Sequence, residues 1–168
     1  MSANQNFVKD PTLIKKDRMR FTKNTLSSTL CYGAILFNVF YFVNIYSTNL
    51  PYYYTAMIGA SVVYNLLFLL FTFLCSEGVK NYSKGYSITV LAIGCLQIVR
   101  IFGIPFMAHN SIMMDTVSKT EIPVMDDGQF YLVIAFLLVS AACAIAAGVI
   151  GIVKTTTLEN YKKTIDAN

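Results

Sequence analysis

Residues 86–107 read YSITVLAIGCLQIVRIFGIPFM, an apolar run that carries one full charge, Arg100. Crossing the roughly 30 Å hydrocarbon layer of a bilayer takes about 20 helical residues, so this run is long enough to span it. Three further apolar runs lie at residues 26–46, 55–75 and 130–153. Because each run is continuous and does not alternate in polarity, we expect helices and not the strands of a barrel.

The composition of the whole chain supports a membrane protein. Of its 168 residues, 55% are hydrophobic and 13% are charged, whereas soluble domains carry about a quarter of charged residues. We therefore expect an all-α membrane protein, one domain over residues 1–168, built as a bundle of four transmembrane helices. Residues 1–25 are polar and basic and show no cleavable signal peptide, so the first run is expected to remain as an anchor.

The basic residues outside the apolar runs gather on one predicted side of the bundle. Residues 47–54 hold none of them and residues 108–129 hold Lys119 alone. The others lie in residues 1–25, in the middle loop and in residues 154–168: Lys9, Lys15, Lys16, Arg18, Arg20, Lys23, Lys80, Lys84, Lys154, Lys162 and Lys163. Cytoplasmic loops carry the excess of lysine and arginine. Both termini are therefore predicted to be cytoplasmic, in what we take to be a bacterial cytoplasmic membrane.

Residues 1–25 also predict a short helix ahead of the first span. Asp10 and Pro11 are typical of an N-cap and a first helical position. We expect the basic residues of this helix to lie against anionic lipids of the inner leaflet, so the bilayer and these lipids are the first predicted partners. A docking site for a cytoplasmic protein is the alternative.

Residues 108–129 form the only sizeable predicted loop, on the outer side. Segments 111–117 and 120–125 can pair as a small β-hairpin around Ser118 and Lys119, with Pro123 keeping the second strand at an edge. Four side chains of this loop invite a metal-site hypothesis: His109, Asp115, Asp126 and Asp127. Their spacing matches no common ligand pattern, so we expect a solvated acidic loop and no metal.

Arg100 lies close to the predicted bilayer centre, where inserting a charged side chain costs roughly 2.5–3.5 kcal/mol on insertion scales. The four runs contain no Asp or Glu, so no carboxylate from another run can pair with it. Neutral partners are available at a matching depth, because amide oxygens accept from a guanidinium and tyrosines offer hydroxyls or ring faces. The expected cluster is Asn38, Asn65, Gln97 and Arg100, with Tyr41 and Tyr64 beside it.

This cluster has two interpretations. It locks the positions of the helices, as polar contacts between membrane helices do, or it binds an anion: a ligand, a lipid headgroup or the carboxylate of a partner. Gly103 and Pro105 follow directly along the chain. A helix that is loosened or ended there can open the cluster toward the outer face.

The last run carries a strip of small residues. Ser140, Ala144 and Gly148 recur every four residues, and Ala147 and Gly151 repeat that spacing. Such a strip lets another helix approach closely. The pattern leaves open whether that helix belongs to the same chain, to a membrane-protein partner or to a second copy in a homo-oligomer.

The inventory of reactive groups argues against an enzyme. The chain has one histidine, and its apolar runs lack acids, so neither an acid–base pair nor bis-histidine haem ligation is supplied. We expect no cofactor and no nucleic-acid partner. The favoured hypothesis is a small binding or accessory subunit that uses the intramembrane cluster. An oligomeric carrier or channel selective for anions is the alternative.

Overall fold

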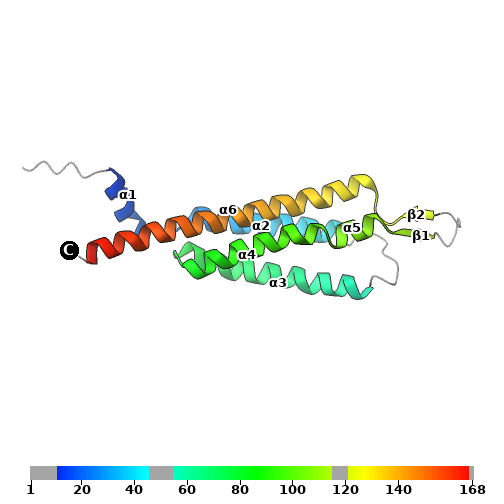
Figure 1. Cartoon of the computed structure of the whole chain (residues 1–168), viewed down its shortest axis with the longest axis horizontal. Helices are drawn as coiled ribbons and strands as arrows, with labels where there is room; N and C mark the ends of the chain where they lie inside the picture. The colour runs from blue at the N-terminus through cyan, green and yellow to red at the C-terminus, as the bar shows by residue number, and fades with distance from the viewer. Residues whose placement is uncertain (1–10, 46–54, 115–120, 167–168) are drawn as a thin grey trace, which may run out of the picture.

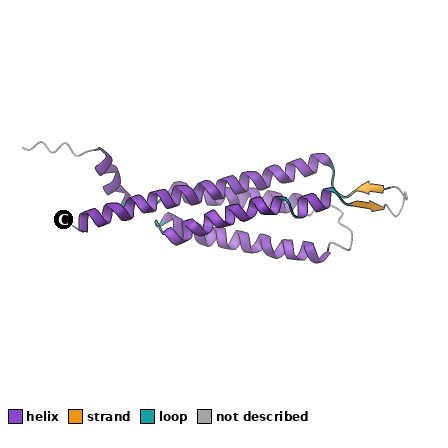
Figure 2. Cartoon of the chain, in the orientation of Figure 1, coloured by secondary structure: helices purple, strands orange, loops and turns teal. Residues whose placement is uncertain are grey.

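The computed structural model describes residues 11–45, 55–114 and 121–166, and these are almost entirely helical (Figures 1 and 2). The helices and strands are α1 (Pro11–Met19), α2 (Thr25–Ile45), α3 (Thr55–Lys80), α4 (Lys84–Ile101), α5 (Ile104–His109), β1 (Ile112–Met114), β2 (Glu121–Pro123) and α6 (Asp127–Asp166). Figure 1 shows α1 and the C-terminus at one end of an elongated bundle and the two strands at the other. We call these the α1 end and the β end.

Four helical segments are long and apolar enough to cross a membrane: Thr25–Ile45, Gly59–Lys80, Lys84–His109 and Asp127–Ile165. Large apolar side chains are exposed on the outside of each, among them Leu36, Leu66, Val99 and Leu138. In water such a surface would be an aggregation hazard, whereas in a bilayer the acyl chains cover it. The chain is a multi-pass membrane protein.

Helix α6 is the centre of the bundle. It packs along both α4 and α2, while α3 completes the bundle by contacting α2 and α4 (Figure 1). The apolar interior falls into two clusters, one containing Ala34 and Ala144 and the other containing Tyr41 and Leu137. Buried polar residues lie between the two clusters. On α2, for example, the buried Asn38 lies between Ala34 of one cluster and Tyr41 of the other.

The small-residue strip of α6 faces the other helices of the same chain. A Cβ built on Gly148 would lie 2.8 Å from the backbone nitrogen of Leu91, and one on Gly151 would lie 2.6 Å from Oγ of Ser87. Ser140 Oγ donates a hydrogen bond to the carbonyl of Ala34 on α2, at 2.8 Å. The whole strip is buried: Ser140, Ala144, Ala147, Gly148 and Gly151. A second copy or a partner that contacts α6 must use another face.

The third span is interrupted and the fourth is longer than the apolar runs indicate. Helix α4 ends at Ile101 and α5 begins at Ile104, with Pro105 in its first turn, where the missing N–H costs no hydrogen bond. Helix α6 continues through Asp166, so the predicted tail after Val153 prolongs the last helix. At 1.5 Å per residue α6 is about 60 Å long, roughly twice the thickness of the hydrocarbon layer.

The β end carries a short antiparallel pair. Ile112 lies opposite Pro123 and Met114 opposite Glu121, so Pro123 sits at the edge, where its missing N–H is tolerated. The backbone N–H of Val124 donates to the carbonyl of Ser111 at 3.0 Å and extends the pair toward the bundle. The predicted turn at Ser118 and Lys119, together with Asp115, lies outside the described residues.

Candidate functional site

Arg100 points from α4 into contact with α3. Its Nη1 donates to Oδ1 of Asn65 at 2.7 Å, and its Nη2 donates to Oγ of Ser61 at 3.1 Å. Ser61 and Asn65 are four residues apart and therefore lie on one face of α3. Two rings also flank the charge, since Cζ of Arg100 is 4.4 Å from the ring centroid of Tyr41 and 4.7 Å from that of Tyr64.

Three amides connect this arginine across the bundle. Asn38 Nδ2 donates to Asn65 Oδ1 at 3.2 Å, and Gln97 Nε2 donates to Asn38 Oδ1 at 2.9 Å. A guanidinium only donates, so Asn65 must present its oxygen to Arg100. That oxygen also takes the donor of Asn38, whose own oxygen then faces Gln97. The charge on Arg100 thus fixes the orientation of all three amides.

Two polar atoms of these three amides have no hydrogen-bond partner among the described residues. Asn38, Asn65 and Gln97 are fully buried. Among the described residues, Nδ2 of Asn65 and Oε1 of Gln97 have no hydrogen-bond partner. A buried polar group without a partner costs about 1–3 kcal/mol. The unpartnered N–H donors of Asn65 belong to the same amide that accepts from Arg100, so a donor and a cation lie side by side.

The structure brings all six sequence-predicted site residues together. Arg100, Asn65, Asn38 and Gln97 form one hydrogen-bonded network, and Tyr41 and Tyr64 contact Arg100 through their rings. Sequence reasoning missed Ser61 as a ligand of the guanidinium. Its spacing of four residues before Asn65 is the signal that could have identified it.

The chemistry of this network is binding chemistry. The contacts given above join Arg100 to uncharged groups, which orient its guanidinium. Arginine keeps its proton in proteins, and amides neither gain nor lose one. The cluster therefore supplies hydrogen-bond donors and a fixed positive charge, and these groups have no proton to exchange near neutral pH.

An apolar groove begins at the cluster. A cavity of about 210 Å³ lies between α3 and α4, and its lining residues are Tyr64, Leu67, Phe68, Phe71, Ile93 and Leu96. Tyr64 belongs to both places, because its ring contacts Arg100 and also lines this groove. From Tyr64 the groove follows α3 through Phe71, toward the α1 end. The groove and the cluster therefore meet at the ring of Tyr64.

The histidine lies apart from this cluster, at the β end. His109 Nδ1 is 3.8 Å from Oδ1 of Asp127, and its ring stacks on Phe130 with 4.2 Å between centroids. Over residues 11–45, 55–114 and 121–166, no three metal-ligating side chains come together. His109 thus helps to hold α5 against the start of α6.

Comparisons with protein-family models, with curated proteins and with solved structures found no match to this chain.

Proposed function

We propose that this protein is a membrane-embedded binding subunit whose Arg100 cluster holds the anionic end of an amphiphile, with the apolar part in the α3–α4 groove. The observation that carries the proposal is the buried Nδ2 of Asn65, which has no hydrogen-bond partner among the described residues, beside the guanidinium. Two kinds of donor close together suit the several acceptor lone pairs of a carboxylate. A single-chain fatty acid has both required parts.

The cost of placing Arg100 in the membrane also favours binding. A packing role needs only neutral amides, and interhelical polar contacts are worth about 0.6 kcal/mol on average. A guanidinium in the same place adds an insertion cost of roughly 2.5–3.5 kcal/mol. A charge that exceeds what packing needs is explained by a ligand of opposite charge.

The distribution of basic residues supports an orientation for this site. Lys80, Lys84 and Lys154 all lie at the α1 end, and the positive-inside rule assigns such an end to the cytoplasm. In that orientation both termini are cytoplasmic, the strand pair is outside, and the groove opens to the inner leaflet. A bacterial cytoplasmic membrane fits this arrangement. Single cysteines introduced at Lys163 and Glu121, labelled in intact cells by an impermeant thiol reagent, test it.

The binding test uses the full chain in lipid nanodiscs with labelled oleate as the probe. Asn65→Asp places a carboxylate beside Arg100 without changing the size of the side chain, and Arg100→Gln removes the charge. We expect each to weaken oleate binding at least tenfold, because the first neutralises and the second removes the positive charge that the ligand needs. Gln129→Glu is the matched control, since it adds a carboxylate of similar size at the β end and should leave binding unchanged.

Three outcomes would overturn the proposal. Oleate that binds both cluster variants as it binds the wild type would leave the cluster a packing device. Arg100-dependent anion flux into liposomes, with no oleate bound, would indicate the oligomeric carrier or channel. Loss of a co-purifying membrane protein in Arg100→Gln, with no oleate bound to the wild type, would show that a partner supplies the carboxylate.

A further inference from the structure

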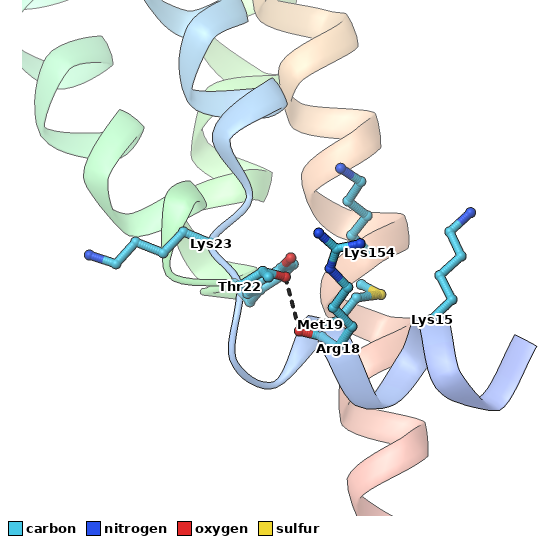
Figure 3. Close-up of a pocket in the computed structure, with 7 residues that line it drawn as sticks. Lys15, Arg18, Met19, Thr22, Lys23 and Lys154 are labelled. Carbon is cyan, nitrogen blue, oxygen red and sulfur yellow. Dashed lines mark hydrogen bonds between the residues drawn. The ribbon is translucent and has the colours of Figure 1, made fainter. Parts of the chain in front are cut away.

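A second cavity lies at the α1 end, where helices distant in the sequence meet. Its volume is about 260 Å³, many times the roughly 10–15 Å³ that one water molecule needs. It lies among α1, the segment between α1 and α2, the loop between α3 and α4, and α6 (Figure 3). Its lining residues are Lys15, Arg18, Met19, Thr22, Lys23, Tyr82 and Lys154.

One cation of this cavity is fixed in place. Lys154 Nζ donates to Oδ1 of Asn24 at 2.9 Å, and Asn24 is buried. Asn24 is held in turn, because its Nδ2 donates to Oγ of Ser27 at 2.8 Å and its backbone N–H donates to the carbonyl of Lys80 at 2.9 Å. The ammonium of Lys154 is thus oriented before any ligand arrives, which lowers the entropy cost of binding.

The other cations come mainly from α1. Figure 3 shows Arg18 reaching toward α6 beside Lys154, while the ammonium of Lys23 points away from them. Thr22 Oγ1 donates to the carbonyl of Arg18 at 3.0 Å, which ties the end of α1 to the segment that leads into α2. Arg18 and Lys154 are separated by most of the chain, so the fold and not the local sequence places them together.

The described residues that line this cavity include four basic side chains and no acidic one. Two carboxylates of the same end pair with other cations. Asp17 lies 3.7 Å from Arg20, and Glu77 lies 3.1 Å from Lys80. The cavity therefore concentrates positive charge without a counter-charge from its own walls.

The cavity also lies at the level of lipid headgroups. It is lined by the segment just before α2 and by the loop between α3 and α4, where apolar spans begin or end. Residues 11–24, which we call the lead-in, expose apolar side chains next to basic ones, since Leu13 is 48%, Ile14 51% and Phe21 82% exposed. Such a segment lies along a membrane interface with its apolar groups in the acyl region.

We propose that this cavity binds a phosphate group, presented by an anionic phospholipid of the adjoining leaflet. Arg18 offers the planar fork of donors that suits phosphate oxygens, and Lys154 offers a preoriented point charge. Bound there, the phosphate joins α1 to α6 and fixes the lead-in against the bundle. This site is separate from the Arg100 cluster, so neither proposal depends on the other.

The test uses the full chain, delipidated in neutral detergent, with three probes: short-chain phosphatidic acid, phosphatidylcholine of the same chain length, and inorganic phosphate. Native mass spectrometry measures the bound molecules and thermal unfolding measures the stabilisation. Lys154→Met and Arg18→Gln each remove one cation of the cavity. Lys162→Met on α6 and Lys16→Gln on α1 are the matched controls, because they remove equal charge from positions that do not line it.

We expect phosphatidic acid to bind the wild type and both controls at least tenfold more tightly than it binds either cavity variant. Inorganic phosphate that shows the same dependence, with no advantage for the lipid, would support the phosphate site and assign it a soluble ligand. Equal loss in the controls would overturn the proposal, since it would show attraction to the general charge of this end. Arg18 is exposed, so its substitution keeps the test valid even if Lys154→Met fails to fold.

Discussion

Arg100 and Lys154 are held in the same way in two different surroundings. A buried asparagine oxygen accepts from each, at 2.7 Å from Asn65 to Arg100 and at 2.9 Å from Asn24 to Lys154. Arg100 lies in the middle of the bundle between aromatic rings, whereas Lys154 lies at the end of the bundle beside an open cavity. Water can solvate Lys154 if its asparagine is lost, but it cannot easily reach Arg100. The same hydrogen bond should therefore be worth more at the centre.

The largest expected effect comes from Asn65→Leu. It removes the acceptor of Arg100 and of Asn38, and we expect the free energy of unfolding to fall by about 2–3 kcal/mol, as for a lost hydrogen bond to a charged group. Unfolding in mixed micelles of increasing denaturing detergent measures it. The double variant Asn65→Leu/Arg100→Leu should recover much of the loss, because no buried charge is left without its acceptor. A double variant as unstable as the single one would contradict this account.

A smaller effect is expected from the ring of Tyr64. Tyr64→Leu removes the aromatic face beside Arg100 and should cost about 1 kcal/mol in the same unfolding measurement. Tyr64→Phe keeps the ring and serves as the control, with an expected change close to zero. If the two variants lose equal stability, the hydroxyl and not the ring stabilises the guanidinium.

Asn24→Leu tests the hydrogen bond that holds Lys154 at the α1 end. It removes the acceptor of Lys154, and we expect a cost of only about 0.5–1 kcal/mol, because the ammonium turns to water. Adding Lys154→Leu to this variant should recover almost nothing. Recovery as large as that at the centre would show that Lys154 is as deeply desolvated as Arg100.

A change in salt concentration should produce the smallest effect, and only at the α1-end cavity. Raising the salt concentration from about 0.05 M to about 0.5 M shortens the screening length several-fold, and exposed charges feel this most. We expect binding of phosphatidic acid to the α1-end cavity to weaken by about threefold, while binding of oleate at Arg100 stays unchanged. Titrations at the two salt concentrations measure both. Equal weakening would place the two sites in similar surroundings.

The central cluster could be predicted from the sequence because depth in a membrane restricts the choices. Four apolar runs of alternating predicted direction place Asn38, Asn65, Gln97 and Arg100 at similar levels, and a charge inside a membrane needs such neighbours. Ser61 was not predicted as a partner, since a serine in a membrane helix is common and carries no such demand. Its spacing from Asn65 indicates a shared face of α3, but that spacing does not specify whether the arginine side chain reaches the serine.

The small-residue strip of α6 shows a different limit of prediction from the sequence. The spacing of Ser140, Ala144 and Gly148 predicts a close approach but contains no information on which helix approaches. In the structure α4 is one of the helices that approach, because its Gly94 and Leu91 face Ala144 and Gly148. The continuation of α6 after Val153 was also not predicted, because lysines and threonines in that segment indicate only that the apolar run has ended.

The α1-end cavity could not be predicted, because it joins residues at opposite ends of the chain. Arg18 and Lys154 each fit a solvated basic segment when read locally. They become one site only because α1 folds back against the C-terminal part of α6. Charge patterns in sequence indicate which side of a membrane a segment occupies, and they do not indicate which side chains meet.

Gly148, whose Cα approaches the backbone of Leu91, lies near the midpoint of the 40 residues of α6. Because Gly148 has no Cβ, α6 and α4 can approach each other closely at this point. The contact therefore sets the separation of α4 and α6 midway along α6, between the end that carries the strand pair and the end that carries the second cavity.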